Sequence, residues 1–119
     1  MKRDEYILQS LFAQWLDRKG VLYCASCGGL RTSITQAVRN KKSGYKKGFP
    51  DIGIYQPVGQ YHGMFIELKS GSYPTPEQKL WCEELNKRGY KALIMPHNLD
   101  YQQSIDWLIK QVEEYLDGR

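Results

Sequence analysis

Hydrophobic residues recur along the chain with two periods, and each period predicts a different element. Apolar positions three and four apart predict a helix, whereas apolar positions two apart predict a half-buried strand. The helical period covers Asp4 to Lys19 and stops at Gly20. Its apolar stripe consists of Ile7, Leu8, Leu11, Phe12, Trp15 and Leu16. Short apolar runs predict two strands, at Val21 to Ala25 and at Tyr90 to Met95.

Capping residues predict where further helices begin. Thr75 suits an N-cap, Pro76 suits the first helical position, and Gln78 can close a capping box. We expect this helix to end near Arg88, before the glycine that follows. Asn98 is the expected cap of a last helix, residues 99–116.

A more polar helix is expected at residues 32–42. The apolar side chains of this helix that we expect to face inward are Ile34, Ala37 and Val38. Residues 43–48 should then form a loop that leads into the next strand.

Two neighbouring segments with the period of a strand predict a hairpin. Residues 51–55 alternate, and residues 56–60 are turn formers. A loop centred near Gly59 places Asp51 opposite Glu67, to within the residue or two by which such registers vary. The expected apolar side of the hairpin consists of Ile52, Ile54, Met64, Ile66 and Leu68.

Glu67 and Lys69 share the other side of their strand, and this arrangement predicts a metal site. Directly opposed positions have Cβ atoms about 5 Å apart. Two carboxylates at that distance repel by roughly 3 kcal/mol at an effective dielectric constant near 20, and one lysine offsets this only in part. Taken alone, Glu-x-Lys is commonly a solvated face, and Pro50-Asp51 is a common loop-to-strand junction. Their combination at hairpin spacing favours a pair of carboxylates that binds a divalent cation.

The element order predicts an α/β protein with a mixed sheet and helices on its faces, formed as one domain over residues 1–119. No apolar run reaches the roughly 20 residues that a membrane span needs, and the first residues lack the apolar core of a secretion signal. We therefore expect no membrane partner and a cytoplasmic location.

Basic residues are concentrated just before Asp51, and the chain carries a net charge of +4. Such a segment attracts a phosphate backbone independently of its sequence. The alternative is a solvated basic loop. The basic residues of this segment are Arg39, Lys41, Lys42, Lys46 and Lys47, with Tyr45 among them.

The three cysteines do not indicate a disulfide scaffold. Cys24 and Cys27 have the spacing of a redox dithiol or of half a zinc site, but two glycines follow at once and disfavour the helix that a dithiol would open. The remaining metal ligands, Cys82, His62 and His97, have no familiar zinc spacing. Buried or incidental cysteines are the favoured interpretation, and a dithiol redox protein is a disfavoured alternative.

An ordered set of motifs resembles the VRR-NUC domain of the PD-(D/E)XK nuclease superfamily, in the small stand-alone form found in bacteriophages. The set covers most of the chain and comprises Glu5-(x3)-Gln9, Gly29-x-Arg31, Gly48-Phe49-Pro50-Asp51, Glu67-Leu68-Lys69, Gln78-x-x-Trp81, Leu85 and Gly89-Tyr90. The resemblance implies a restriction-endonuclease-like fold. A phage-encoded protein would act in the cytoplasm of a bacterial host.

The resemblance also implies roles for individual residues. Asp51 and Glu67 would ligate Mg²⁺ or Mn²⁺, the Leu68 carbonyl would add a ligand, and Lys69 would be catalytic. Glu5 and Gln78 would have accessory roles near the metal and the nucleophile, with Glu5 as a possible ligand. The helix macrodipole and the capping box also account for Glu5 and Gln78 without catalysis.

Substrate and assembly are further implications of the resemblance. We expect a metal-dependent DNA endonuclease, selective for branched DNA such as four-way junctions, that acts as a homodimer. The expected DNA contacts are Arg31, Lys41, Lys42, Lys46 and Lys47. Residues 73–74, Tyr-Pro, depart from the basic residue of eukaryotic relatives, so a phosphate contact from that loop is not expected. Tyr101, Trp107 and Tyr115 could serve a dimer interface or the core. The alternative function is a non-catalytic nucleic-acid-binding domain with a relic nuclease site.

Overall fold

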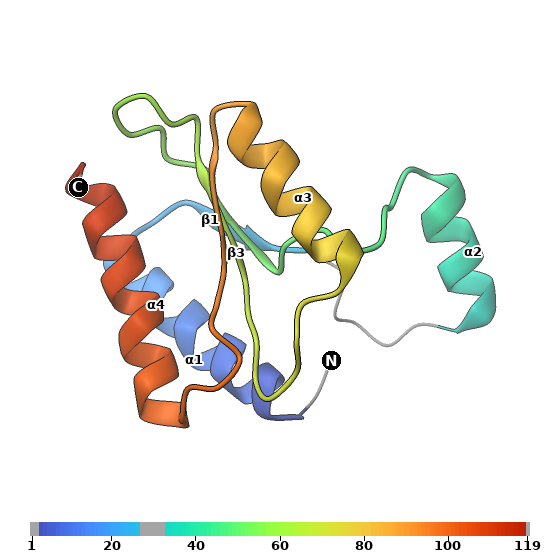
Figure 1. The fold of residues 1–119 in the computed structure, drawn as a ribbon, viewed down its shortest axis with the longest axis horizontal. Helices are drawn as coiled ribbons and strands as arrows, with labels where there is room; N and C mark the ends of the chain where they lie inside the picture. The colour runs from blue at the N-terminus through green and yellow to red at the C-terminus, as the bar shows by residue number, and fades with distance from the viewer. Residues whose placement is uncertain (1–2, 27–32, 119) are drawn as a thin grey trace.

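A four-stranded mixed sheet lies between helices in this computed structural model, which describes residues 3–26 and 33–118 (Figure 1). The elements in chain order are α1 (Arg3–Lys19), β1 (Tyr23–Ala25), α2 (Ile34–Lys42), β2 (Ile52–Ile54), β3 (Met64–Glu67), α3 (Pro76–Lys87), β4 (Lys91–Ile94) and α4 (Tyr101–Leu116). The strand order is β1-β2-β3-β4, with antiparallel pairs except for the parallel pair β3 and β4. The predicted α/β class, a mixed sheet flanked by helices, is confirmed.

The register of the β2–β3 hairpin agrees with the sequence prediction. Ile52 pairs with Ile66, so one further step along the ladder places Asp51 opposite Glu67. Gly59 lies in the connecting turn with a positive φ of 58°, which favours glycine. The apolar alternation therefore directs both acidic residues to the same side of the sheet.

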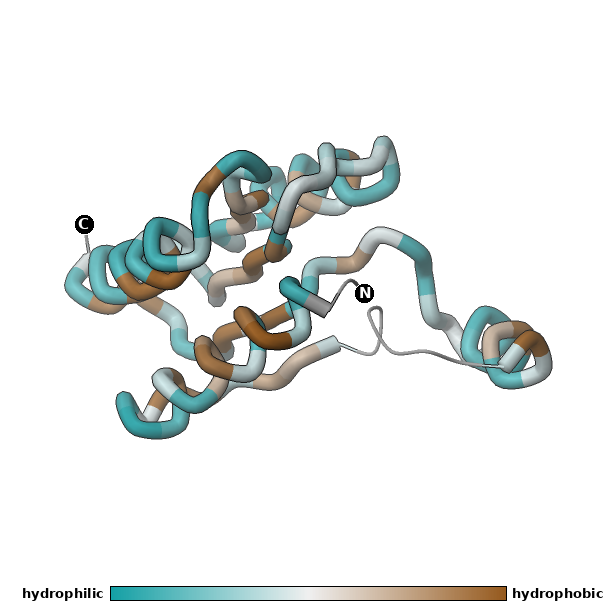
Figure 2. The backbone as a smooth tube through the Cα atoms, turned by 90° about the horizontal axis from the view of Figure 1, so that it is seen from below, coloured by the Kyte–Doolittle hydropathy of each residue, from teal (hydrophilic) through white to brown (hydrophobic). Residues whose placement is uncertain are grey.

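Both faces of the sheet are covered. On one face, α1 and α4 pack on the apolar side of the hairpin, and the largest buried cluster there includes Phe12, Ile66 and Leu108. On the other face, α3 covers a smaller cluster formed around Phe65 and Leu85. Figure 2 shows the hydrophobic positions concentrated in the interior of the main body. No helix within the described residues is long and apolar enough to cross a membrane.

The prediction that the apolar side of α2 faces inward is wrong. Ile34 and Val38 are 87% and 48% exposed, and no residue of α2 is buried. The helix stands apart from the sheet at the right of Figure 1. An amphipathic pattern requires a partner surface before it can be buried, and within the described residues this helix has none.

The expected cap of the last helix is also wrong. The helix starts at Tyr101, where Asp100 is the N-cap and Gln103 completes a capping box. The carboxylate of Asp100 accepts a hydrogen bond from the Gln103 N–H at 2.8 Å, so it performs the function assigned to Asn98. The predicted cap at Thr75, with Gln78, is confirmed.

Candidate active site

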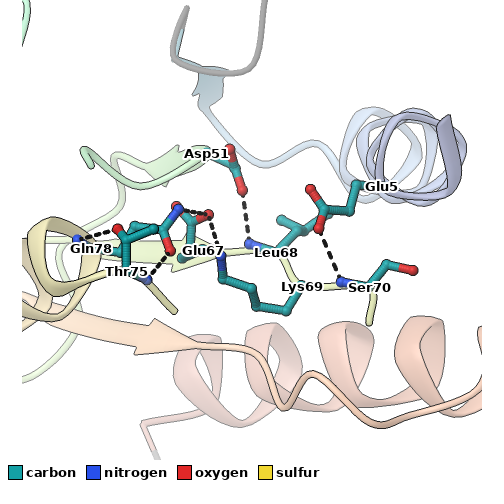
Figure 3. A network of polar contacts seen from close by, with 8 residues as sticks. All are labelled: Glu5, Asp51, Glu67, Leu68, Lys69, Ser70, Thr75 and Gln78. Carbon is teal, nitrogen blue, oxygen red and sulfur yellow. Dashed lines mark hydrogen bonds and ion pairs between the residues drawn. The ribbon is translucent and has the colours of Figure 1, made fainter. Parts of the chain in front are cut away.

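Two carboxylates and one ammonium meet at the ends of β2 and β3, as the hairpin prediction required (Figure 3). Asp51, Glu67 and Lys69 are only 8%, 6% and 5% exposed. The Lys69 Nζ lies 3.8 Å from the Glu67 Oε2. A solvated face, the alternative interpretation of Glu-x-Lys, is therefore excluded.

The segment before Asp51 is held against α3. Gly48 has a φ of +93°, and a Cβ atom there would lie 2.7 Å from Glu77 atoms at the start of α3. Phe49 then packs edge-on against both Phe65 and Trp81. This packing positions the backbone of Asp51 at the start of β2, which explains why glycine and an aromatic residue precede the carboxylate.

Hydrogen bonds orient both carboxylates. The Asp51 Oδ2 accepts from the backbone N–H of Leu68 at 2.9 Å. The Glu67 Oε2 accepts from the Gln78 Nε2 at 3.0 Å (Figure 3). Each acid thus has a defined partner on the protein side, which holds the pair in one geometry.

The carboxylate pair lacks enough positive charge to be fully ionised. Burial, and next the negative charge of Asp51, raises the pKa of Glu67 from its ordinary 4.5 to about 9. Burial also raises the pKa of Asp51, although the hydrogen bond from Leu68 opposes the shift. Lys69 lowers both values but does not cancel the desolvation. A site of this kind favours the uptake of a positive charge, either a proton or a metal ion.

Gln78 performs two functions with the two ends of its amide. Its Oε1 accepts from the Thr75 N–H at 2.9 Å and completes the capping box, while its Nε2 donates to Glu67. The sequence prediction treated capping and a role at the site as alternatives. The structure brings both together in one side chain.

Glu5 reaches the same region from α1. Its Oε1 accepts from the backbone N–H of Ser70 at 3.1 Å, and its charge contributes to the raised pKa of Glu67 (Figure 3). Across the described residues, no three Asp, Glu, His or Cys side chains gather closely enough to hold one metal ion. The roles of Glu5 and of the Leu68 carbonyl as ligands stay predictions.

Two solved structures have a fold similar to that of this chain. The chain aligns with a solved structure titled "VRR_NUC domain protein" at a TM-score of 0.77 and 28% identity, over 99% of this chain and 92% of that one. A second structure, titled "VRR_NUC domain", shares the fold at a TM-score of 0.61 and 21% identity, over 96% of this chain and 99% of that one. These similarities support a VRR_NUC domain. No family model and no curated protein sequence matches the chain.

A VRR_NUC domain indicates a nuclease-type protein, and the carboxylates at the ends of β2 and β3 fit a hard divalent ion. Carboxylate oxygens are the ligands that Mg²⁺ and Mn²⁺ prefer, and Mg²⁺ is commonly held by one or two carboxylates together with substrate phosphates and water. Asp51 and Glu67 supply two such groups in a buried position, and their raised pKa values mean that a metal ion can take the place of a proton there.

The basic residues predicted to bind DNA precede Asp51 in the sequence, and the four that the structure describes are exposed. Lys41 and Lys42 end α2, and Lys46 and Lys47 follow in the next loop, all four exposed. Arg31 lies outside the described residues, as does Cys27 of the disfavoured dithiol. The other cysteine of that dithiol, at position 24, is exposed.

The aromatic residues of α4 separate into different environments. Tyr115 is buried and donates to the Gln56 carbonyl at 2.6 Å, and Trp107 packs against the core. Tyr101 is exposed. Of these three, Tyr101 is the most exposed and could contact a partner, and the dimer stays a prediction.

Sequence reasoning missed Ser70, whose backbone N–H anchors Glu5. It also missed the N–H of Leu68, because only the carbonyl of that residue was considered. Backbone donors carry no side-chain signature, so no pattern in the sequence identifies them. For Gln78 a signal existed, since a capping box uses the amide oxygen and leaves the amide nitrogen free to donate.

Proposed function

We propose that this chain is a Mg²⁺- or Mn²⁺-dependent endonuclease that hydrolyses phosphodiester bonds in DNA, with selectivity for branched DNA such as four-way junctions. The buried pair of Asp51 and Glu67 beside Lys69 carries the proposal, because two buried carboxylates with a single neighbouring ammonium favour the binding of a divalent cation. The similarity to proteins named for a VRR_NUC domain supports the reaction class. The basic residues that precede Asp51 support a polyanionic substrate.

Asp51 and Glu67 would hold the metal ion through their carboxylate oxygens, and the Leu68 carbonyl and Glu5 are the further proposed ligands. When bound, the ion supplies Lewis-acid polarisation of the phosphate and lowers the pKa of a coordinated water. The hydrogen bonds from Leu68 and Gln78 keep the two carboxylates oriented before the substrate arrives.

Lys69 is the group that acts on the reacting atoms. Its ammonium, 3.8 Å from Glu67, would donate a hydrogen bond that orients the attacking water and stabilises negative charge on the phosphate oxygens. Glu5, anchored on the Ser70 N–H, would orient water from the α1 side. Gln78 is a positioning residue that acts through Glu67.

The preference for branched DNA would follow from a homodimer in which two sites related by a two-fold axis cut two strands. Twofold dimers are the commonest assembly of soluble oligomers. Analytical ultracentrifugation at micromolar concentration tests this part separately. A monomer that resolves junctions by paired incision would refute the dimer without affecting the nuclease assignment.

The decisive experiment incubates the protein with a four-way junction and with linear duplex DNA, in Mg²⁺, in Mn²⁺ and in EDTA. Asp51→Asn, Glu67→Gln and Lys69→Met should each abolish cleavage while the protein remains folded. Matched controls make the same changes on the exposed side of α4, namely Asp106→Asn, Glu113→Gln and Lys110→Met. Undiminished cleavage by Glu67→Gln would overturn the assignment. DNA binding without cleavage in any metal would establish the relic-site alternative.

A further inference from the structure

Two hollows meet along the side of α3 that faces residues 44–49. The first has a volume of about 400 Å³ and is lined by Lys46, Leu80, Trp81, Glu84, Leu85 and Arg88. The second has a volume of about 390 Å³ and is lined by Ser26, Gly44, Tyr45, Lys46, Phe49 and Trp81. Because Trp81 and Lys46 line both hollows, we treat the two as one groove, the Trp81 groove.

The Trp81 groove begins next to the candidate active site. Trp81 follows Gln78 by three residues on α3, which is about 4.5 Å along the helix axis. Gln78 donates to Glu67, and Gly48 packs against the same turn of the helix. A DNA strand with a phosphate at the carboxylate pair therefore has its neighbouring nucleotides within reach of the groove.

The walls of the groove combine an aromatic surface with positive charge. The Trp81 ring is held edge-on against Phe49, with ring centres 5.0 Å apart and planes at 83°. Glu84 and Arg88 form an ion pair at 2.7 Å, so their charges largely cancel. Lys46 is exposed and forms no ion pair within residues 3–26 and 33–118.

This combination matches unpaired nucleic acid better than it matches a duplex or an apolar peptide. Proteins bind single strands with aromatic rings that stack on bases and with cations that contact the phosphates. A duplex exposes its phosphates but keeps its bases stacked inside, so it would leave the aromatic walls unused. An apolar peptide would leave Lys46 without a partner.

We propose that the Trp81 groove takes an unpaired base of the DNA strand that is cut, stacked on Trp81, with Lys46 on an adjacent phosphate. This inference rests on the proposed nuclease function and specifies its substrate further. The substrate would have a nucleotide close to the scissile phosphate that can leave the base stack, which costs less next to a branch point than inside a continuous duplex. Selectivity for branched DNA would then arise within one subunit, in addition to any contribution from a dimer.

The test measures DNA binding in EDTA, so that cleavage does not interfere, by fluorescence anisotropy with a four-way junction. Trp81→Leu keeps an apolar side chain in the cluster around Phe65 but removes the stacking surface, whereas Trp81→Phe keeps a ring. We expect Trp81→Leu to weaken binding about 5- to 100-fold and Trp81→Phe to weaken it much less. Tyr101→Leu, on the exposed side of α4, is the control for loss of an aromatic residue, and its oligomeric state is checked by analytical ultracentrifugation because Tyr101 is also available to a dimer interface.

A second measurement uses the wild-type protein and therefore does not depend on how the variants fold. Single abasic sites are placed in turn at each nucleotide flanking the branch. An abasic site at one or two of these positions should weaken binding of the wild-type protein by the factor seen for Trp81→Leu. At the same positions, an abasic site should not weaken binding of Trp81→Leu further. The proposed role of the Trp81 groove would be refuted if binding were equal for every position of the abasic site. It would also be refuted if Trp81→Phe and Trp81→Leu lost the same affinity for DNA.

Failure of the groove and failure of the nuclease give different results. Asp51→Asn should lose cleavage and keep the dependence on the flanking base. Cleavage by a protein whose DNA binding does not depend on the flanking base would refute the role of the groove alone. Binding that depends on the flanking base, without cleavage in any metal, would refute the nuclease function alone.

Discussion

The metal-free protein should lose stability as the pH rises, and Glu67 should be the main cause. Its pKa in the folded protein is about 9, against an ordinary value of 4.5. Between these values the folded chain keeps a proton that the unfolded chain has released, so the free energy of unfolding falls as the pH rises. The stability is fully present below pH 4.5 and decreases by at most about 1.4 kcal/mol per pH unit above it.

Glu67→Gln isolates this effect. The amide cannot ionise, has nearly the same shape as the protonated acid, and still offers an oxygen to the Gln78 Nε2. At pH 7, which is 2.5 units above 4.5, the variant should be more stable than the wild type by up to about 3 kcal/mol. Part of the loss of stability with rising pH comes from Asp51, whose pKa is also raised. The gain in unfolding free energy given for Glu67→Gln is therefore an upper bound.

The assay is urea unfolding in EDTA at pH 5, 6, 7 and 8, with Glu113→Gln as an exposed control. Effects that are common to all three proteins cancel in the differences. Adding Mg²⁺ should stabilise the wild type, increasingly at higher pH, because the ion replaces the proton. It should stabilise Glu67→Gln much less. An equal pH slope in wild type and Glu67→Gln, or a variant less stable than wild type at pH 8, would refute the reasoning.

Three further predictions concern the surroundings of the site. Gln78→Ala should cost about 1 kcal/mol in unfolding free energy and also reduce single-turnover cleavage, whereas Thr75→Ala should cost a similar stability with less effect on cleavage, because it removes only the cap. Gly48→Ala should destabilise the protein more in thermal unfolding than Gly44→Ala, since both have positive φ but only the first places a Cβ against α3; equal effects would contradict this. Ile34→Ser should change the unfolding free energy by less than about 0.5 kcal/mol, because this side chain is exposed, and a larger loss in urea unfolding would show that α2 is buried in solution.

The register of the hairpin was predictable because the alternation of apolar and polar residues in its two strands leaves little choice of pairing. A slip of one residue in β2 or β3 would move Ile52 and Ile66 out of the core and bring the charged residues into it. The start of α3 was predictable for a similar reason, since Thr75 and Pro76 each suit one position only.

The position of α2 was not predictable from its pattern. Ile34 and Val38 have the spacing of a buried stripe, yet the pattern does not indicate whether another surface faces it. The prediction of a cap at Asn98 failed for a different reason, because Asn98 and Asp100 are both good caps near the start of that helix and only one can be used. Both errors concern a choice between local options that long-range packing decides.

The carboxylate pair breaks the rule that the rest of the sheet obeys, and this is the strongest structural argument for a functional site. Neighbouring positions of the hairpin bury apolar side chains, whereas Asp51 and Glu67 bury like charges whose ionisation opposes folding. Replacing buried charged groups by apolar residues of similar volume is often neutral or stabilising, so stability alone does not account for the pair. Local rules are broken mainly at functional sites. The donors from Leu68 and Gln78 hold the pair in place but supply no positive charge, so the site still favours a proton or a metal ion.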